Sequence, residues 1–182
     1  MNDLTRVNVQ CRAEITGNKL GGYASVFDQT ADLGWLGRER VARSAFDAVL
    51  ADSATDVRAL FNHDASMLLG RQASKTLRLS TDSHGLEFEI DLPNTSLGRD
   101  VRELVERGDI DGASFGFVPG DYDWDEDRAT VTHTSVSRLV DVSPVTFPAY
   151  IGASTEARSE GRIIVSQRSQ LIQARARVLF HR

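Results

Sequence analysis

Ser114 carries the hydroxyl of a short apolar run, GASFGF, at residues 112–117. A serine hydroxyl can attack a peptide carbonyl when a base takes its proton and a third group orients that base. Gly112 and Gly116 flank this serine, and glycine lets backbone and substrate approach closely. The alternative is structural, because a serine between glycines is also typical of a strand edge or a bulge. Ser114 is therefore a candidate nucleophile whose role depends on its neighbours.

Histidine is the side chain best suited to act as the base, because its protonation changes near neutral pH. The chain has four histidines: His63, His84, His133 and His181. His84 falls in a predicted hairpin turn, His181 lies next to the C-terminus, and His133 lies in an alternating strand where it could face solvent. His63 follows the apolar run VRALF in the polar sequence NHD, which places it at a strand end beside a loop. His63 is the strongest candidate for a base, although a surface histidine would fit the same pattern.

Asp141 is the candidate orienting group, since it lies in the otherwise apolar stretch VDVSPV. By strand alternation, Val140 and Val142 face the opposite side from Asp141. Burying a carboxylate costs free energy unless it is paired, so Asp141 should have a partner. A structural ion pair between Asp141 and an arginine explains this pattern as well as a catalytic role does. Asp64, next to His63, should point to the other face of its strand.

Two strongly periodic segments surround these candidates. KTLRLSTDSHGLEFEIDLP, at residues 75–93, alternates apolar and polar residues on both sides of a polar turn, which predicts a β-hairpin. NTSLGRDVRELVERGD, at residues 94–109, carries four apolar residues on one helical face. This pattern predicts a helix that is capped by Thr95 or Ser96 and ended by Gly108.

Strand patterns dominate most of the remaining chain. QTADLGWLGRER, at residues 29–40, has no clear period and predicts a long loop, whereas residues 43–52 predict a short helix. A long strand within residues 129–147 should be broken by Pro144 and by Pro148, which follows it. About seven strands and two or three helices indicate an α+β, mainly β fold, an antiparallel β-barrel with surrounding helices.

The C-terminal segment differs from the rest in charge. Residues 161–182 contain five arginines and no acidic residue. We therefore divide the chain into a domain at 1–157 and a basic amphipathic tail at 158–182. The tail is either a frayed terminal helix on the domain surface or a segment that docks on a partner.

The composition bounds the class of protein. The chain has 182 residues, of which 41% are hydrophobic and 26% charged, a balance typical of one globular domain. Its net charge of −5 speaks against nucleic-acid binding, and its single cysteine, Cys11, excludes an internal disulfide and a cysteine-based zinc site. No stretch approaches the roughly 18 apolar residues of a membrane-spanning helix, and the first residues lack a signal-peptide core. We therefore expect no metal, cofactor, nucleic-acid or membrane partner.

A set of short motifs, in a fixed order, resembles a known family. The motifs are GYASVFD (22–28), ALFNHD (59–64), LG (69–70), GLEFEIDLPNT (85–95), RGDIDGASFGF (107–117) and VDVSPVTFPAY (140–150). No single motif is specific, but the ordered set resembles the prohead proteases of tailed phages, whose fold is related to herpesvirus assemblin. The resemblance covers most of the chain and implies an assemblin-like fold.

The resemblance implies a role for each matching residue. Ser114 takes the place of the nucleophile and His63 that of the general base. Asp141 lies where the family commonly has a glutamate as the third member. Because the herpesvirus relatives use a second histidine there, His133 is a weaker alternative. The loop at 148–150, with Ala149 and Tyr150, is the expected source of oxyanion donors.

The same resemblance implies a function. Such a protein would be a serine endopeptidase that acts inside the procapsid in the host cytoplasm. It would cleave an extension of the major capsid protein or a scaffold, and also itself. The related assemblins act as dimers, so a homodimer is a possible state. Two alternatives remain: a catalytically silent assembly or scaffolding factor that binds coat protein, and a plain β-barrel binding module. Convergence of Ser114, His63 and Asp141 in the fold would favour the enzyme.

Overall fold

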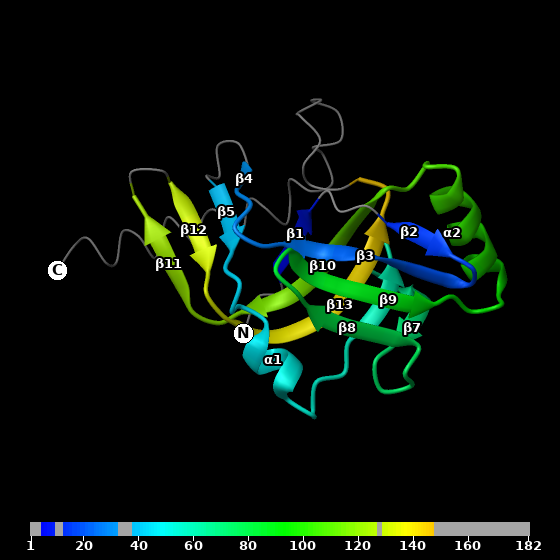
Figure 1. The fold of residues 1–182 in the computed structure, drawn as a ribbon, viewed down its shortest axis with the longest axis horizontal. Coiled ribbons are helices and arrows are strands. Elements are labelled where there is room, and N and C mark those ends of the chain that lie inside the picture. The colour runs from blue at the N-terminus through cyan, green and yellow to red at the C-terminus, as the bar shows by residue number, and fades with distance from the viewer. Residues whose placement is uncertain (1–4, 10–12, 33–37, 127–128, 148–182) are drawn as a thin grey trace. The chain divides into compact units, whose positions relative to one another are not determined.

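Strands dominate the structure, a computed structural model that describes residues 5–9, 13–32, 38–126 and 129–147 (Figure 1). The described strands are β1 (Thr5–Val9), β2 (Glu14–Thr16), β3 (Lys19–Val26), β4 (Ala31–Asp32), β5 (Arg38–Val41), β6 (Arg58–Phe61), β7 (Asp64–Arg71), β8 (Leu77–Thr81), β9 (Gly85–Asp91), β10 (Gly112–Pro119), β11 (Tyr122–Asp125), β12 (Thr130–His133) and β13 (Val136–Val145). The described helices are α1 (Asp47–Ala51) and α2 (Ser96–Glu106). The mainly β class that the sequence predicts is therefore confirmed.

The strands form three sheets. Their orders are β1-β10-β13-β6-β7, β11-β12-β5-β4 and β2-β3-β9-β8. Pairing is antiparallel except between β13 and β6 and between β12 and β5, which are parallel. Within the described residues the sheets do not close into a barrel, so the predicted barrel is not found.

The number of described strands exceeds the predicted seven, because short strands show too little alternation of apolar and polar residues to be recognised in the sequence. The segment at 129–147 is not one strand but two, since backbone N–H groups of Thr134 and Ser135 both donate to the Asp121 carbonyl and turn the chain there. β12 and β13 consequently join different sheets. The predicted loop at 29–40 contains β4 and the start of β5, whose pairing partners lie elsewhere in the sequence.

The predicted hairpin and helix are confirmed. β8 and β9 pair antiparallel, and in the turn the Asp82 carboxylate accepts a hydrogen bond from the Gly85 N–H at 2.9 Å. Thr95 caps α2, because its hydroxyl oxygen accepts a hydrogen bond from the Gly98 N–H at 3.2 Å. Gly108 follows the helix with a φ of +78°, a conformation that favours glycine. Local sequence signals therefore decide these two elements.

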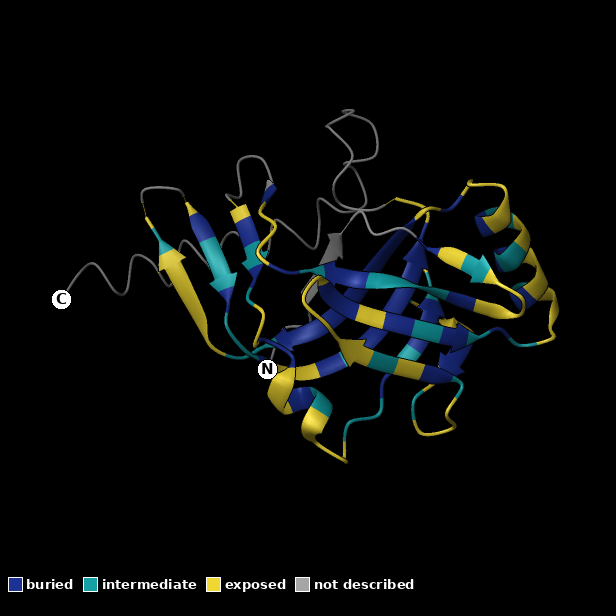
Figure 2. Ribbon diagram, in the orientation of Figure 1, coloured by how far each residue is buried: buried dark blue, intermediate teal, exposed yellow. Residues whose placement is uncertain are grey.

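β10 is buried along almost its whole length, between β1 and β13 (Figure 2). Its aromatic residues build the adjacent core: the Phe115 ring meets Phe46 edge-on at 5.4 Å between centroids and stacks on Phe117 at 4.9 Å. Large aromatic rings in such contacts leave little freedom for the backbone that carries them. Ser114, which directly precedes Phe115, is thus held on a rigid strand.

Pro144 lies inside β13 and does not break the strand as predicted. Its carbonyl accepts a hydrogen bond from the Asn62 N–H at 3.1 Å, on the side of β13 that faces β6. A strand residue points its N–H and C=O to the same side, so the missing N–H also faces β6. The β6–β13 pairing ends at Val142, opposite Ala59, so no ladder bond is lost at the proline.

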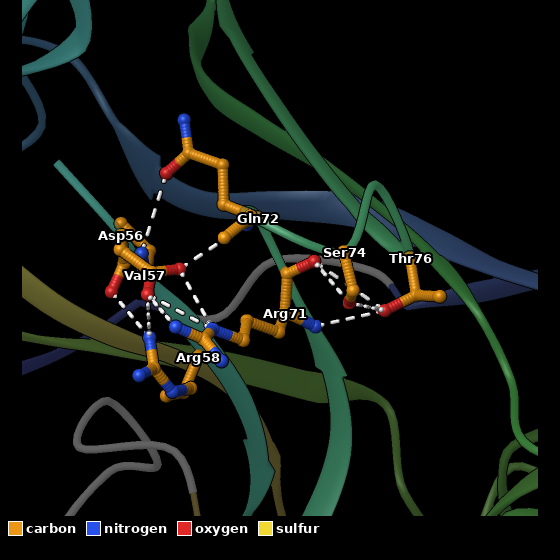
Figure 3. A network of polar contacts seen from close by, with 8 residues as sticks. Asp56, Val57, Arg58, Arg71, Gln72, Ser74 and Thr76 are labelled. Carbon is orange, nitrogen blue, oxygen red and sulfur yellow. Dashed lines mark hydrogen bonds and ion pairs between the residues drawn. The ribbon is translucent and has the colours of Figure 1, made fainter. Parts of the chain in front are cut away.

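A polar network ties β6 to β7 at the end far from the turn that joins them (Figure 3). The Asp56 carboxylate accepts hydrogen bonds from the Arg71 guanidinium, the shortest at 2.6 Å, and from the Ala73 N–H at 3.1 Å. It also pairs with Arg58 at 2.9 Å. The hydrogen bond from Arg71 is the main reason why the pKa of Asp56 falls to about 2. This network fixes the base of the hairpin whose tip carries His63.

Candidate active site

Ser114, His63 and Asp141 form one hydrogen-bonded row. The distance from His63 Nε2 to Ser114 Oγ is 2.7 Å, and that from His63 Nδ1 to Asp141 Oδ1 is 2.5 Å. An ionised carboxylate only accepts hydrogen bonds, so Nδ1 carries the imidazole proton and donates it to Asp141. Nε2 is then the acceptor for the Ser114 hydroxyl proton. The three residues come from three separate segments of the chain, and the fold brings them together.

Ser114 is the third residue of β10. It pairs with Ser143 of β13 on one side and with Asn8 of β1 on the other. The residue has no exposed surface, and the His63 side chain is 8% exposed. Hydrogen bonds in such a dry site are stronger than in water, because the local dielectric constant is low.

His63 does not end a strand as predicted, but lies in the turn between β6 and β7. Asn62 and His63 are the two turn residues, and both have positive φ, 54° and 58°. Type I′ hairpin turns need positive φ at both positions, and asparagine adopts it readily. A histidine at the second position is less usual, and strained backbone of this kind is found at functional sites. The turn thereby points His63 toward β10 and β13.

Asn62 fastens this turn to the end of β13. Its side-chain amide donates to Thr146 Oγ1 at 3.1 Å, and its side-chain carbonyl accepts from the Thr146 N–H at 2.9 Å. Its backbone N–H donates to the Pro144 carbonyl. The imidazole of His63 is therefore fixed relative to the strand that carries Asp141.

Asp141 is buried and lies opposite Gly116 in the β10–β13 ladder. In the described part of the chain its ion-pair partner is His63, not an arginine. The Ser143 hydroxyl donates a further hydrogen bond to Asp141 Oδ1 at 2.8 Å. A Cβ on Gly116 would clash with Asp141 Oδ2, so this glycine makes room for the carboxylate. That is a different reason for Gly116 from the approach of substrate that the sequence suggested.

His133, the alternative third member, lies in another sheet and has another partner. It belongs to β12 and is buried, so the expectation that it could face solvent is wrong. Its Nε2 lies 2.5 Å from Glu39 Oε1, and its ring meets Phe117 edge-on at 5.1 Å between centroids. His84 is exposed in the β8–β9 turn, as predicted, and packs against the Tyr23 ring. Of the described histidines, only His63 contacts Ser114.

Several predictions concern residues that the structure does not describe. These are the oxyanion donors at Ala149 and Tyr150, the position of Pro148, the boundary at 157/158, the tail at 158–182, Cys11 and His181. Among the described residues, there is no group of histidine, cysteine and acidic side chains that could hold a metal ion. No described helix is long and apolar enough to span a membrane.

Sequence reasoning missed Ser143, Asn62 and the true role of Gly116. For Ser143 a signal was present, because residues two apart on a strand share a face and Asp141 is two residues away. For Asn62 the signal was the asparagine itself, which readily adopts the positive φ of a two-residue hairpin turn. For Gly116 no local signal exists, since its partner Asp141 is set by strand register.

A hydroxyl, an imidazole and a carboxylate in one hydrogen-bonded row are the arrangement of the serine hydrolases. The model of one family, described as caudovirus prohead serine protease, matches residues 6–165 of the chain. The chain belongs to this family, and it is thus a member of the serine proteases of phage capsid maturation. It has no significant match among curated proteins or among solved structures.

Proposed function

We propose that the protein is a serine endopeptidase of procapsid maturation. Its substrate is either an N-terminal extension of the major capsid protein or a scaffold. One observation carries this proposal: His63 Nε2 lies 2.7 Å from Ser114 Oγ while its Nδ1 lies 2.5 Å from Asp141 Oδ1. Membership of the prohead serine protease family supports the choice of substrate. The resemblance to assemblins suggests a homodimer and cleavage of the chain by itself.

The row of hydrogen bonds suits acyl transfer in two steps. Ser114 Oγ attacks the scissile carbonyl while His63 Nε2 takes the hydroxyl proton and later gives it to the leaving amine. Water, activated by the same imidazole, then cleaves the acyl-enzyme and releases Ser114. Asp141 stays ionised throughout, holds the imidazole in the tautomer with the proton on Nδ1, and stabilises the imidazolium. No cofactor takes part in this scheme.

Backbone N–H groups of Ala149 and Tyr150, which follow Pro148, would stabilise the tetrahedral oxyanion in this scheme. Loss of one such donor typically raises the barrier by about 3 kcal/mol. The assignment follows from the family resemblance. The protein would act inside the procapsid, in the host cytoplasm, without a nucleic-acid or membrane partner.

Burial of Ser114 favours a second candidate, a catalytically silent assembly factor that binds coat protein. Because Ser114 has no exposed surface, a substrate carbonyl reaches it only after some neighbouring group moves. A protein that has Ser114, His63 and Asp141 but does not let a substrate reach Ser114 would bind coat protein without cleaving it. The two candidates predict different products when coat protein is present.

Co-expression with the cognate capsid protein distinguishes these candidates. The masses of both proteins are compared for wild type, Ser114→Ala and the matched control Ser137→Ala, which removes a β13 hydroxyl that bonds Val118 and Pro119 carbonyls away from the site. A protease predicts shortened coat protein with wild type and control, but not with Ser114→Ala. Equal cleavage by all three would place the nucleophile elsewhere. Intact coat protein in all three, with the chain still encapsidated, would support the assembly factor.

A further inference from the structure

Ser143 is a buried serine that contacts the candidate triad but is not one of its three members. Its residue surface is 0% exposed, and its Oγ lies 2.8 Å from Asp141 Oδ1. A carboxylate only accepts, so the Ser143 hydroxyl is the donor. The same oxygen, Oδ1, accepts the hydrogen bond from His63 Nδ1. One carboxylate oxygen therefore receives two donors from two different elements.

Strand geometry explains why Ser143 is in this place. Asp141 and Ser143 are two residues apart on β13 and so share a face of the sheet. Ser143 also lies directly opposite Ser114 in the β10–β13 ladder, and Gly116 lies opposite Asp141. The second carboxylate oxygen, Oδ2, fills the space that a side chain at position 116 would occupy. The carboxylate is thus confined by His63, Ser143 and the bare backbone of Gly116.

We propose that Ser143 is a positioning residue that fixes the carboxylate of Asp141 and, through it, the ring of His63. The proposal deepens the proposed function and rests on it. A carboxylate held by one donor alone can rotate about its χ2 bond, and the imidazole that follows it loses its alignment with Ser114 Oγ. The Ser143 hydroxyl donates to the carboxylate, so Ser143 would act on Ser114 through Asp141 and His63.

The rate at which a fluorophosphonate probe labels the full chain measures how well Ser114 is activated, and intact mass records the product. We expect Ser143→Ala to lower this rate about 10- to 100-fold, the effect of losing one hydrogen bond to a charged group. Ser143→Thr, which keeps the hydroxyl, is expected to recover most of the rate. Ser137→Ala, the control on the same strand, is expected to react as wild type does.

A second readout separates positioning from mere packing. The proton between His63 Nδ1 and Asp141 Oδ1 is expected to give a far-downfield proton resonance, which is assigned by its loss in His63→Ala. We expect this resonance to shift or broaden in Ser143→Ala and to return in Ser143→Thr. If Ser143→Ala does not fold, Ser143→Cys, which preserves the volume with a much weaker donor, takes its place.

The outcomes test the two proposals separately. Unchanged labelling rate and resonance in Ser143→Ala, together with no labelling of Ser114→Ala, would overturn the role of Ser143 and leave the protease intact. A Ser143→Thr rate as low as that of Ser143→Ala would also overturn it, since the hydroxyl would not matter. Labelling of Ser114→Ala at the wild-type rate would instead refute the proposed function.

Discussion

Gly116 of β10 lies directly opposite Asp141 of β13, and a Cβ on Gly116 would clash with Asp141 Oδ2. A glycine inside a strand normally weakens it, because it adds backbone entropy and packs nothing. Here it creates the space in which a buried carboxylate can face His63. β10 thus carries, two residues after the candidate nucleophile Ser114, the position that makes room for the Asp141 carboxylate.

Replacing Gly116 with alanine tests this relationship. We expect Gly116→Ala to displace Asp141, to lower the rate of probe labelling by at least about tenfold and to destabilise the fold by about 1 to 3 kcal/mol, as overpacking does. Urea unfolding measures the stability. Gly21→Ala is the control, since a Cβ at that strand glycine meets only the Phe88 carbonyl at an ordinary 3.5 Å. Equal effects of both substitutions would argue against a specific role for Gly116.

Neutralising Asp141 is expected to leave the fold in place but to remove most of the activity. In Asp141→Asn the side-chain amide can donate to Nδ1, which favours the tautomer with the proton on Nε2 and leaves Ser114 without a base. Asparagine in the third position of a serine-protease triad costs roughly 10⁴-fold in rate, and we expect a loss of that order. Cleavage of capsid protein over time measures it. A loss of less than tenfold would show that Asp141 is not the orienting group.

Asn62 combines a backbone role and a side-chain role, and two substitutions separate them. Asn62→Gly keeps the positive φ but removes both bonds to Thr146, whereas Asn62→Ala loses both features. We expect Asn62→Ala to cost about 1 to 3 kcal/mol of stability and Asn62→Gly to cost less. Both variants should label more slowly than wild type, because the turn that carries His63 is less firmly held. If alanine were as stable as glycine, the turn would not depend on positive φ.

Acid is expected to weaken the β6–β7 hairpin through Asp56. Its pKa is about 2 in the folded protein, below the ordinary value of 3.8, chiefly because Arg71 donates to it. A carboxyl group with a lowered pKa stabilises the fold above its unfolded pKa, and this contribution is lost as the pH falls through the folded pKa. Between about pH 4 and pH 2 the urea midpoint of wild type should therefore fall more steeply than that of Asp56→Asn.

The comparison isolates Asp56 from the other carboxylates. Asp82, Glu89 and Asp91 also have lowered pKa values, owing mainly to hydrogen bonds from Tyr23, Lys19 and Arg78 respectively, but they titrate in both proteins. Their contribution cancels in the difference. Added salt should reduce the effect, since the pair lies near solvent. Parallel pH curves for wild type and Asp56→Asn would contradict the role of the network.

Local features were predictable from the sequence, and contacts set by register were not. The hairpin at 75–93 and the helix at 94–109 follow from periodicity and caps within one segment. Ser114, His63 and Asp141 were identifiable as candidates from their residue types and motif order, but their distances depend on how three distant segments pair. The roles of Ser143 and Gly116 depend on the register of β10 with β13, which the sequence does not display.

The sheet arrangement shows the same limit. β12 pairs with β5 in parallel across a long separation in sequence, and a loop was predicted where β5 begins. Short strands of four residues have too few alternating positions to be distinguished from loops. Pro144 was expected to break a strand because proline has no N–H to donate. Its backbone nitrogen faces β6, however, and the β6–β13 pairing has already ended at Val142, so β13 continues through the proline. Pairing partners, not local preference, decide these cases.

The proposed function requires one activation step, in which His63 and Asp141 make Ser114 a nucleophile. Its most direct test is to label the full chain with a fluorophosphonate probe and to map the modified residue by mass spectrometry of peptides. We expect one adduct, on Ser114, that is absent in Ser114→Ala and strongly reduced in His63→Ala and Asp141→Asn. Ser137→Ala is expected to be labelled as wild type is. An adduct on another residue, or labelling at Ser114 that does not depend on His63, would contradict it.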